Sequence, residues 1–344
     1  MIRFADIFGQ DTTIAWLKQA YASNRLPHAM LFAGPIGVGK GTTALAVATL
    51  FLCEKPSGTD PCGHCDSCRL MSAADEPNHP DFHRVYRQLI RREKKTSVAR
   101  DLAIDTIRDH VVRPAGLKAS MARGKVFVIE EADTMNLAAQ NALLKTLEEP
   151  IGRTLIILLT DQPGALLPTI RSRCQLVRFL PLNQDLVARE LIKRGIDARD
   201  ATDAAKFTEG SMGMAQQWIA DGILTHARFL HSKLAQLIAG ASAADLPEWF
   251  KQAGEEFAAK LLDRDDLASK DQSTREGMLL YLRIAANELR KQLREVEGED
   301  AERLCSAIDA VNLAGTLIES NVNVSLIFQQ LAIQLDRQFA TVIG

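Results

Sequence analysis

Three short apolar runs predict buried strands over residues 30–33, 125–129 and 154–159. Apolar residues recur at helical spacing between them, over about 40–52 and over 136–149. We expect the second of these helices to turn four leucines inward: Leu137, Leu143, Leu144 and Leu147. Strands that alternate with helices predict a three-layer α/β core around a parallel sheet.

Weaker patterns extend this core. Alternation of apolar and polar residues predicts a further strand over 81–86, and helical spacing predicts helices over 11–24, 65–74 and 102–112. After residue 181 the strand signals end, and three short helices are predicted over 184–193, 200–207 and 211–220.

Residues 221–344 are helical by the same criterion, with a polar break at 263–276 and a last amphipathic helix near 324–339. No catalytic constellation stands out in this part of the chain, and a packed helical bundle used for oligomerisation is the simplest interpretation. We therefore predict an α/β domain over 1–180, a small helical domain over 181–220 and an all-α domain over 221–344.

A glycine-rich turn joins the first strand to the helix behind it. Gly34, Gly37 and Gly39 allow backbone N–H groups to converge on an anion, and the helix adds the positive end of its dipole. Lys40 adds a full charge for outer phosphates, and the segment fits the phosphate-loop pattern G-x-x-x-x-G-K-[ST] up to its last position. Gly41 occupies that last position, where Ser or Thr would supply the hydroxyl that ligates Mg²⁺. The loop is thus expected to hold the phosphates of ATP with one ligand for Mg²⁺ missing; a bare strand–helix turn is the alternative.

Acidic residues follow the second apolar strand as Glu130-Glu131-Ala132-Asp133. Carboxylates at the carboxyl end of a buried strand face the same crevice as the phosphate loop. One of them can hold Mg²⁺ through water, and the next can polarise an attacking water, so Glu130 and Glu131 are candidate catalytic residues. The usual first residue of such a pair is Asp, and Glu130 departs from that rule.

Four of the six cysteines lie close together in sequence: Cys53, Cys62, Cys65 and Cys68. The repeated C-x2-C spacing lets thiolates converge tetrahedrally on one Zn²⁺, and four thiolates make a closed, structural site. The segment 53–68 is therefore predicted to be a zinc loop inserted in the first domain, with an iron–sulfur cluster as the main alternative. His64 is expected to face solvent, and the isolated Cys174 and Cys305 are expected to be buried.

Composition narrows the class of protein only a little. The chain has 344 residues, of which 47% are hydrophobic and 24% charged, and its formal net charge is -2. This balance argues against a protein that coats nucleic acid by charge alone. A basic run over 84–100 is a solvated loop or a contact for a phosphate backbone. No apolar stretch of membrane-spanning or leader-peptide length is evident, so we expect a cytoplasmic protein with no membrane partner.

Together the motifs resemble those of bacterial clamp-loader subunits of the AAA+ ATPase family. The resemblance rests on 34–40, 130–133, the stretch Ala139-Gln-Asn-Ala-Leu-Leu-Lys-Thr-Leu-Glu-Glu-Pro150 and Ser172-Arg-Cys174, and it covers about the first 220 residues. It implies that Arg173 reaches the nucleotide of a neighbouring subunit, and that Thr160 occupies the sensor position at a strand end. Thr42, after the phosphate loop, joins the candidate nucleotide contacts. The resemblance also implies gamma/tau and delta partner subunits in a hetero-oligomer, with a sliding clamp and primed DNA reached through that complex.

Three departures from the family pattern point in one direction. Gly41 removes a metal ligand, Glu130 moves another, and Gly213 stands where the ATP-hydrolysing subunits carry an arginine. They favour a subunit that hydrolyses ATP poorly or not at all and supplies Arg173 in trans, within a DNA polymerase III holoenzyme that is a nucleotidyltransferase as a whole. The alternatives are an ATP-hydrolysing gamma/tau subunit and, from another class, a zinc-dependent nucleic-acid-binding module.

Overall fold

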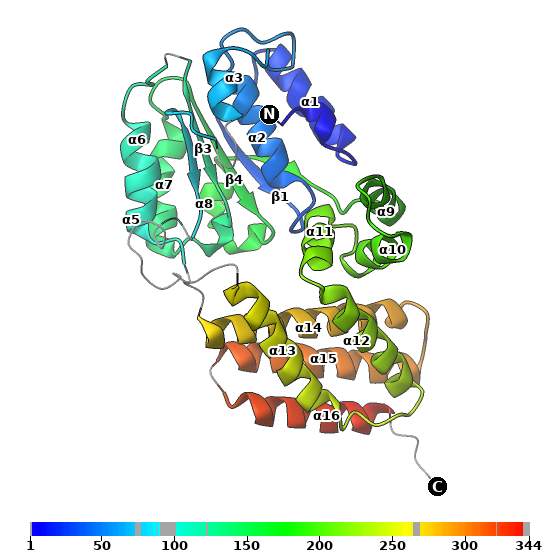
Figure 1. Cartoon of the computed structure of the whole chain (residues 1–344). Coiled ribbons are helices and arrows are strands. Elements are labelled where there is room, and N and C mark those ends of the chain that lie inside the picture. Colours follow the sequence, from blue (N-terminus) through cyan, green and yellow to red (C-terminus); the bar gives the residue numbers. More distant parts are fainter. Residues whose placement is uncertain are drawn as a thin grey trace. The chain divides into compact units, whose positions relative to one another are not determined.

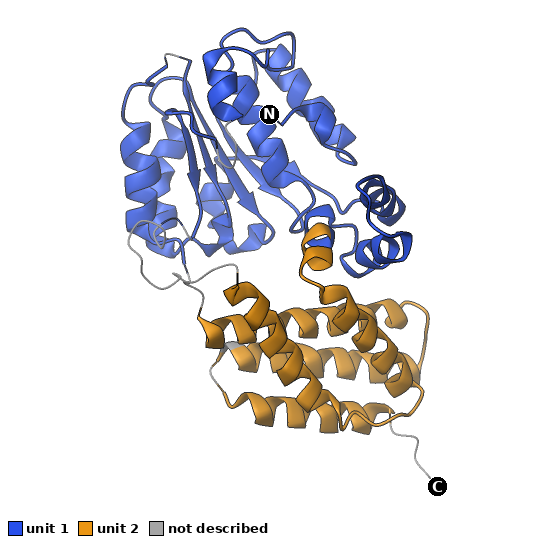
Figure 2. Cartoon of the chain, in the orientation of Figure 1, with its two compact units in different colours: residues 1–215 blue, residues 216–344 orange. Residues whose placement is uncertain are grey.

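The computed structural model describes residues 2–72, 77–87, 89, 101–121, 123–263, 269–320 and 322–339. Most of the basic run over 84–100 lies outside these residues. The chain divides into two compact units, residues 1–215 and 216–344 (Figure 2).

The first unit is built on a five-stranded parallel sheet with the order β2-β3-β4-β1-β5 (Figure 1). Its strands are β1 (Ala29–Ala33), β2 (Phe82–Val85), β3 (Lys125–Ile129), β4 (Thr154–Thr160) and β5 (Gln175–Arg178). The three central strands are buried along their whole length, as their continuous apolar sequences predict. Edge strand β5 was not predicted, because only Val177 of its four residues is buried and its pattern is too short to detect.

Helices cover both faces of this sheet. One face packs against α1 (Asp11–Ala22) and α2 (Lys40–Leu52), and the other packs against α7 (Leu137–Glu148) and the short helices around it. Those short helices are α5 (Ile104–Ile107), α6 (Arg113–Ala115) and α8 (Pro168–Arg171). Helix α3 (Asp66–Met71) follows the cysteine loop. This arrangement confirms the predicted α/β fold class.

Two expectations for these helices were wrong in detail. Leu137 is 62% exposed, because it is the first residue of α7, beyond the Asn136 cap, whereas Leu143 and Leu147 are buried. The helix predicted over 102–112 begins only at Ile104 and passes through a π-helical turn, Arg108–Val112, before α6. Leu102 instead forms a bridge to Met135.

Three short helices follow the sheet, close to where the sequence predicts them: α9 (Gln184–Lys193), α10 (Ala198–Phe207) and α11 (Met212–Ala220). Asn183 and Asp197 cap the first two through their side chains. Helix α11 runs across the boundary between the two units. The prediction of three domains remains a prediction.

The described part of the second unit consists of helices, as predicted, and they are α12 (Ile223–Ile238), α13 (Leu246–Leu262), α14 (Lys270–Leu293), α15 (Glu299–Glu319) and α16 (Val324–Phe339). Its core includes a stacked pair, Phe250 and Phe328, with ring centroids 4.7 Å apart. Helix α14 starts at Lys270, so the polar break is shorter than the predicted 263–276.

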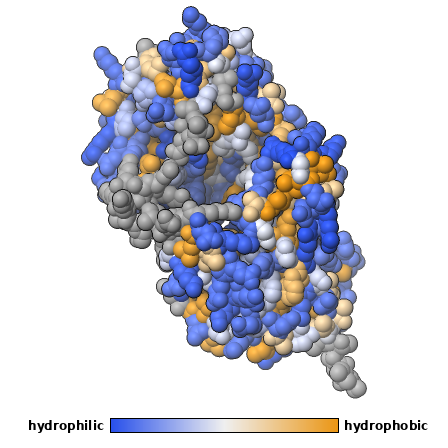
Figure 3. Space-filling model, viewed as in Figure 1, coloured by the Kyte–Doolittle hydropathy of each residue, from blue (hydrophilic) through white to orange (hydrophobic). Residues whose placement is uncertain are grey.

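Hydrophilic residues dominate the face seen in Figure 3, with smaller apolar patches between them.

Candidate nucleotide and metal sites

The phosphate loop adopts the backbone that its glycines permit. Gly37 and Gly39 have φ values of 74° and 100°, in the left-handed region, and Gly39 is the N-cap of α2. A Cβ at Gly34 would lie 2.2 Å from the carbonyl oxygen of Phe179, so only glycine fits there. Gly41 differs, because a Cβ at this position would meet only Leu159 Cδ1 at 4.0 Å. A serine could therefore occupy position 41, and its absence is not imposed by packing.

Lys40 is engaged with its own loop. Its Nζ donates to the carbonyl oxygens of Gly34 and Pro35, each at 2.6 Å. Burial lowers the pKa of Lys40, while the nearby Asp161 and Asp133 partly offset this effect. The ammonium group predicted to bind outer phosphates is thus hydrogen-bonded within the chain.

Both candidate catalytic carboxylates are paired with arginines of the neighbouring strand end. Arg84 donates to Glu130 from Nε at 2.7 Å and from Nη2 at 3.2 Å, and Arg87 donates to Glu131 from Nε at 2.5 Å and from Nη2 at 2.9 Å. Because β2 and β3 are parallel neighbours, their carboxyl ends bring these residues together. A forked guanidinium satisfies a carboxylate at both oxygens, so Glu130 and Glu131 are each neutralised internally.

The partners of these carboxylates were not identified from the sequence. Arg84 was assigned to the predicted strand over 81–86 and to the basic run, and Arg87 to the basic run, but the order of strands in the sheet cannot be read from the chain. Thr160 does lie at the end of β4, where it is 1% exposed and donates from its hydroxyl to Asp133 at 2.6 Å. Thr42, on the first turn of α2, is partly exposed. These contacts do not test the predicted role of Thr160 and Thr42 in nucleotide binding.

The start of α11 contacts the phosphate loop directly. Ser211 Oγ donates to the carbonyl oxygen of Ile36 at 2.8 Å, and the backbone N–H of Gly213 donates to the carbonyl oxygen of Gly37 at 3.0 Å. A Cβ at Gly213 would lie 3.0 Å from Gly37 Cα, which is too close for backbone that cannot give way. Any side chain at position 213, including the arginine that the resemblance leads one to expect there, would therefore require the backbone at Gly37 to shift by a few tenths of an ångström.

Arg173 lies after α8, near the amino end of β5. Its guanidinium pairs with Glu148 at the end of α7 and also donates from Nη1 to the carbonyl oxygen of Thr169 at 3.0 Å. The side chain of Arg173 is 33% exposed. Within this single chain, a local carboxylate holds the arginine predicted to act on a neighbour.

The four clustered cysteines come together as the spacing predicts. Their sulfur atoms all lie within 4.8 Å of one another, with Cys53 and Cys65 4.0 Å apart and Cys62 and Cys68 3.9 Å apart. Backbone N–H groups point at three of the sulfurs, as in the contact from Cys65 N to Cys62 Sγ at 3.4 Å. This set of donors could hold a metal ion.

The pKa values of three of the clustered cysteines are shifted in different directions. The backbone N–H of His64 lowers the pKa of Cys62 to about 6, whereas burial raises the pKa values of Cys53 and Cys68. A cation would be needed to keep the buried thiols ionised. His64 is exposed, as predicted, and so is Cys305, which was expected to be buried; Cys174 is buried.

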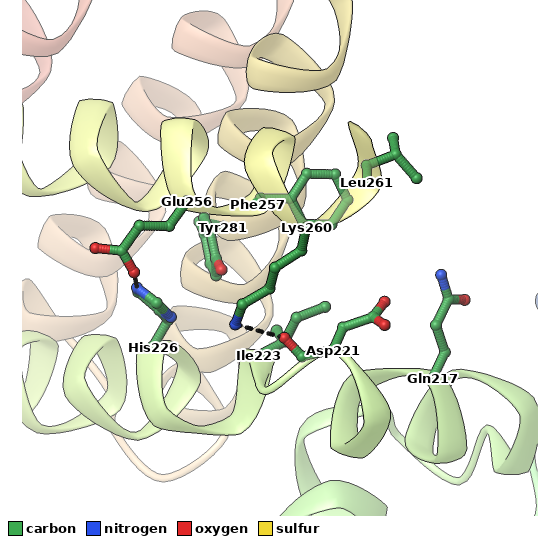
Figure 4. A pocket seen from close by; sticks show the side chains of 9 residues that line it. All are labelled: Gln217, Asp221, Ile223, His226, Glu256, Phe257, Lys260, Leu261 and Tyr281. Carbon is green, nitrogen blue, oxygen red and sulfur yellow. Dashed lines mark hydrogen bonds and ion pairs between the residues drawn. The ribbon is translucent and has the colours of Figure 1, made fainter. Parts of the chain in front are cut away.

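The second unit contains a separate small cavity of about 50 Å³ (Figure 4). His226 Nε2 lies 3.1 Å from a carboxylate oxygen of Glu256 across it, and Lys260 Nζ donates to the carbonyl oxygen of Asp221 at 2.7 Å. The buried Tyr281 lies against the same space. A cavity of this size suits one or two water molecules, so we assign no ligand to it.

These features define a P-loop α/β protein. They are a glycine-rich loop between β1 and α2, carboxylates after the parallel strand β3, and helices that contact the loop. The family model described as DNA polymerase III, delta subunit, matches residues 9–183, and the chain belongs to this family.

Among known proteins, the chain is 31% identical over 215 residues to DNA polymerase III subunit delta-prime of Pseudomonas aeruginosa and 34% identical over 200 residues to that of Escherichia coli. These matches cover 62% and 58% of this chain, and it spans 60% and 56% of the two relatives. It is also 31% identical over 237 residues to a gamma/tau subunit of Mycobacterium bovis, covering 66% of this chain and 39% of that protein.

The similar solved structures include a gamma subunit-related protein of Thermotoga maritima, at 18% identity and a TM-score of 0.44, with 94% of this chain and 99% of that chain covered. None of the helices in the described ranges has both the length and the apolar character needed to cross a bilayer.

Proposed function

We propose that this protein is a delta-prime-like subunit of the DNA polymerase III clamp loader, which helps to place a sliding clamp on primed DNA. Membership of the family and the two delta-prime relatives support this assignment. The pairing of Glu130 with Arg84 and of Glu131 with Arg87 supports the further proposal that this subunit hydrolyses little or no ATP itself. Such a subunit works inside a cytoplasmic complex with gamma/tau and delta partners, and it reaches the clamp and DNA through them.

The chain's own ATP site is proposed to be silent or nearly so. Mg²⁺ needs carboxylate or hydroxyl oxygens that can face it, but both carboxylates are engaged by guanidinium groups and Gly41 offers no hydroxyl. Moving one catalytic group by an ångström can cost roughly a hundredfold in rate. Loss of several such groups therefore leaves little hydrolysis.

Arg173 is proposed to act on the nucleotide of a neighbouring subunit. An arginine supplied in trans stabilises charge on the transferring phosphoryl group and raises rates by about 10³–10⁵ where this has been measured. Because Arg173 pairs with Glu148 in the single chain, docking of a neighbour has to exchange that carboxylate for phosphate oxygens. A partly exposed ion pair of this kind is weak enough to exchange.

The cysteine cluster is proposed to hold a structural Zn²⁺. Tetrahedral coordination with Zn–S bonds of about 2.3 Å requires sulfurs roughly 3.8 Å apart, which is close to the spacing of the two nearest sulfur pairs. All four positions are filled by protein, so the ion would stabilise the loop after α2 and would not serve catalysis.

The test of the proposed function is a clamp loader reconstituted with this chain. Arg173→Ala should lower clamp- and DNA-stimulated ATP hydrolysis partially while the complex still assembles, as judged by size exclusion. Arg171→Ala, an exposed arginine on the adjacent α8, is the matched control and should have no effect. Undiminished hydrolysis in a fully assembled Arg173→Ala complex would remove the trans role.

A gamma/tau-type, ATP-hydrolysing subunit is the second candidate. It is favoured by the 31% identity to the gamma/tau protein and by the room for a serine at position 41. Hydrolysis of ATP by the isolated chain separates it from the first proposal.

A further inference from the structure

A cleft lies at the amino ends of the parallel strands β1 and β4, whereas the phosphate loop lies at the carboxyl end of β1. It has a volume of about 360 Å³ and is lined by residues that include Tyr21, Leu26, His28, Phe51, Pro150 and Arg153. Ligand pockets in proteins commonly measure about 300–1,000 Å³, so this cleft is at the small end of the range. It suits a few side chains of a partner better than a large cofactor.

The cleft is fixed by packing that the sequence specifies. The Arg153 guanidinium lies over the Phe51 ring, 4.1 Å from its centroid, and donates from Nη1 to the carbonyl oxygen of Arg123 at 2.9 Å. A Cβ at Gly124 would lie 2.4 Å from the Arg153 carbonyl oxygen and 3.0 Å from Phe51, so this wall needs glycine. His28 is held by the carbonyl oxygen of Leu147 at 2.8 Å. The lining is therefore preformed.

The cleft carries positive charge that no carboxylate among the described residues neutralises. Within the described residues, no carboxylate pairs with Arg153 or with the adjacent Arg123, and the buried Nε of Arg123 has no hydrogen-bond partner. Burial, and then the neighbouring Arg123, lower the pKa of Arg153, while Tyr21 partly offsets this effect through a side-chain hydrogen bond. By contrast, Arg84, Arg87 and Arg173 in the same unit all have carboxylate partners.

We propose that this cleft binds a segment of a partner protein that presents an acidic side chain beside an apolar one. The carboxylate would take the donors of Arg153 that the Arg123 carbonyl oxygen and Tyr21 leave available, and the apolar side chain would pack against Leu26 and Pro150.

A nucleic acid is the weaker fit. Glu149 is exposed and immediately precedes Pro150, so a continuous phosphate backbone would meet like charge at this rim. A single carboxylate can reach Arg153 without crossing it. The proposal does not depend on the ATP site or on the role of Arg173.

The test uses the full chain and two capped tetrapeptides, N-acetyl-Gly-Asp-Phe-Gly-amide and its Asn counterpart, followed by amide chemical shifts in NMR spectra. The Asp peptide should shift the amides of Asn24, Gly152 and Thr154, and the Asn peptide should bind about tenfold more weakly, since it loses a charge-assisted hydrogen bond. Arg153→Gln should cause a similar tenfold loss. Arg199→Gln, an exposed arginine on α10, should cause none.

A second pair of variants keeps Arg153 in place. Gly152 has a φ of 69° and open space around its Cβ position, a conformation that Asp and Asn tolerate among non-glycine residues. Gly152→Asp should offer Arg153 an internal carboxylate and abolish peptide binding, whereas Gly152→Asn should bind nearly as well as the parent protein. Equal binding of the Asp and Asn peptides, or equal effects of Gly152→Asp and Gly152→Asn, would overturn the proposal. Tighter, Arg153-dependent binding of an oligothymidylate than of the Asp peptide would overturn it in favour of a nucleic-acid site.

Discussion

The phosphate-loop site and the cysteine cluster, both in the first unit, treat their reactive groups in opposite ways. At the phosphate loop, Lys40 binds its own loop carbonyls, and Glu130 and Glu131 each bind an arginine. At the cluster, the described contacts of the four sulfurs are with one another and with backbone N–H groups.

The two sites differ in how their polar groups are satisfied. At the proposed metal site, burial raises the pKa values of Cys53 and Cys68, so these thiols would need a bound cation to ionise. Groups released from a ligand are satisfied within the chain, which removes the cost of leaving them unpaired. Sequence motifs indicate this distinction only in part, because Gly41 and Glu130 depart from the expected pattern but the internal partners of Lys40, Glu130 and Glu131 depend on tertiary contacts.

Removing the metal should give the largest effect. Cys65→Ser, or a strong chelator, should lower the zinc content from one per chain and destabilise the first unit by at least about 3 kcal/mol, roughly 6–12 °C in Tm for a domain of this size. Cys305→Ser, an exposed thiol outside the cluster, should leave both quantities unchanged. Calorimetry with metal analysis measures them, and a purified protein without stoichiometric metal would refute the structural site.

Crowding the contact between α11 and the phosphate loop should have a smaller effect. Gly213→Ala places a Cβ 3.0 Å from Gly37 Cα, and overpacking of this kind costs about 1–3 kcal/mol. Gly164→Ala, where a Cβ meets nothing within 4 Å, is the control. Denaturant unfolding compares the two variants. If Gly213→Ala were as stable as Gly164→Ala, the close contact at the loop would not be rigid.

Releasing the two carboxylates should partly reopen the phosphate-loop site. Arg84→Gln combined with Arg87→Gln frees Glu130 and Glu131, so Mg²⁺-dependent affinity for ATP should rise by about tenfold, or 1.4 kcal/mol. Titration of a fluorescent ATP analogue with and without Mg²⁺ measures the change, with the exposed Arg108→Gln as control. An unchanged dependence on Mg²⁺ would mean that the ion pairs are not what closes the site.

The smallest effect is expected from pH, in the second unit. Burial lowers the pKa of His226, although Glu256 opposes this, so the folded state keeps the imidazole neutral. The unfolded histidine titrates near 6.5, and below that pH the unfolded chain binds the extra proton. Stability is therefore complete above about pH 6.5 and falls as the pH drops further. Thermal melts between pH 7 and pH 5 should show a loss of a few degrees, and this loss should be smaller in His226→Gln.

The sequence predicts the sheet, the phosphate loop and the cysteine cluster because each depends on local spacing. Continuous apolar runs identify β1, β3 and β4, and C-x2-C spacing places thiols on one loop. Two features depended on tertiary contacts and could not be predicted. The Arg84–Glu130 pair requires the order of strands in the sheet, and the approach of Gly213 to Gly37 requires the path of the chain after residue 181.

Turnover of ATP by the isolated chain tests whether the phosphate-loop site has been closed by the chain's own residues. At saturating Mg²⁺ and ATP, we expect a rate far below about 1 s⁻¹, the lower end of ordinary enzyme turnover. A rate of about 1 s⁻¹ or more that is lost in Lys40→Ala would contradict the account and would identify this chain as an ATP-hydrolysing subunit.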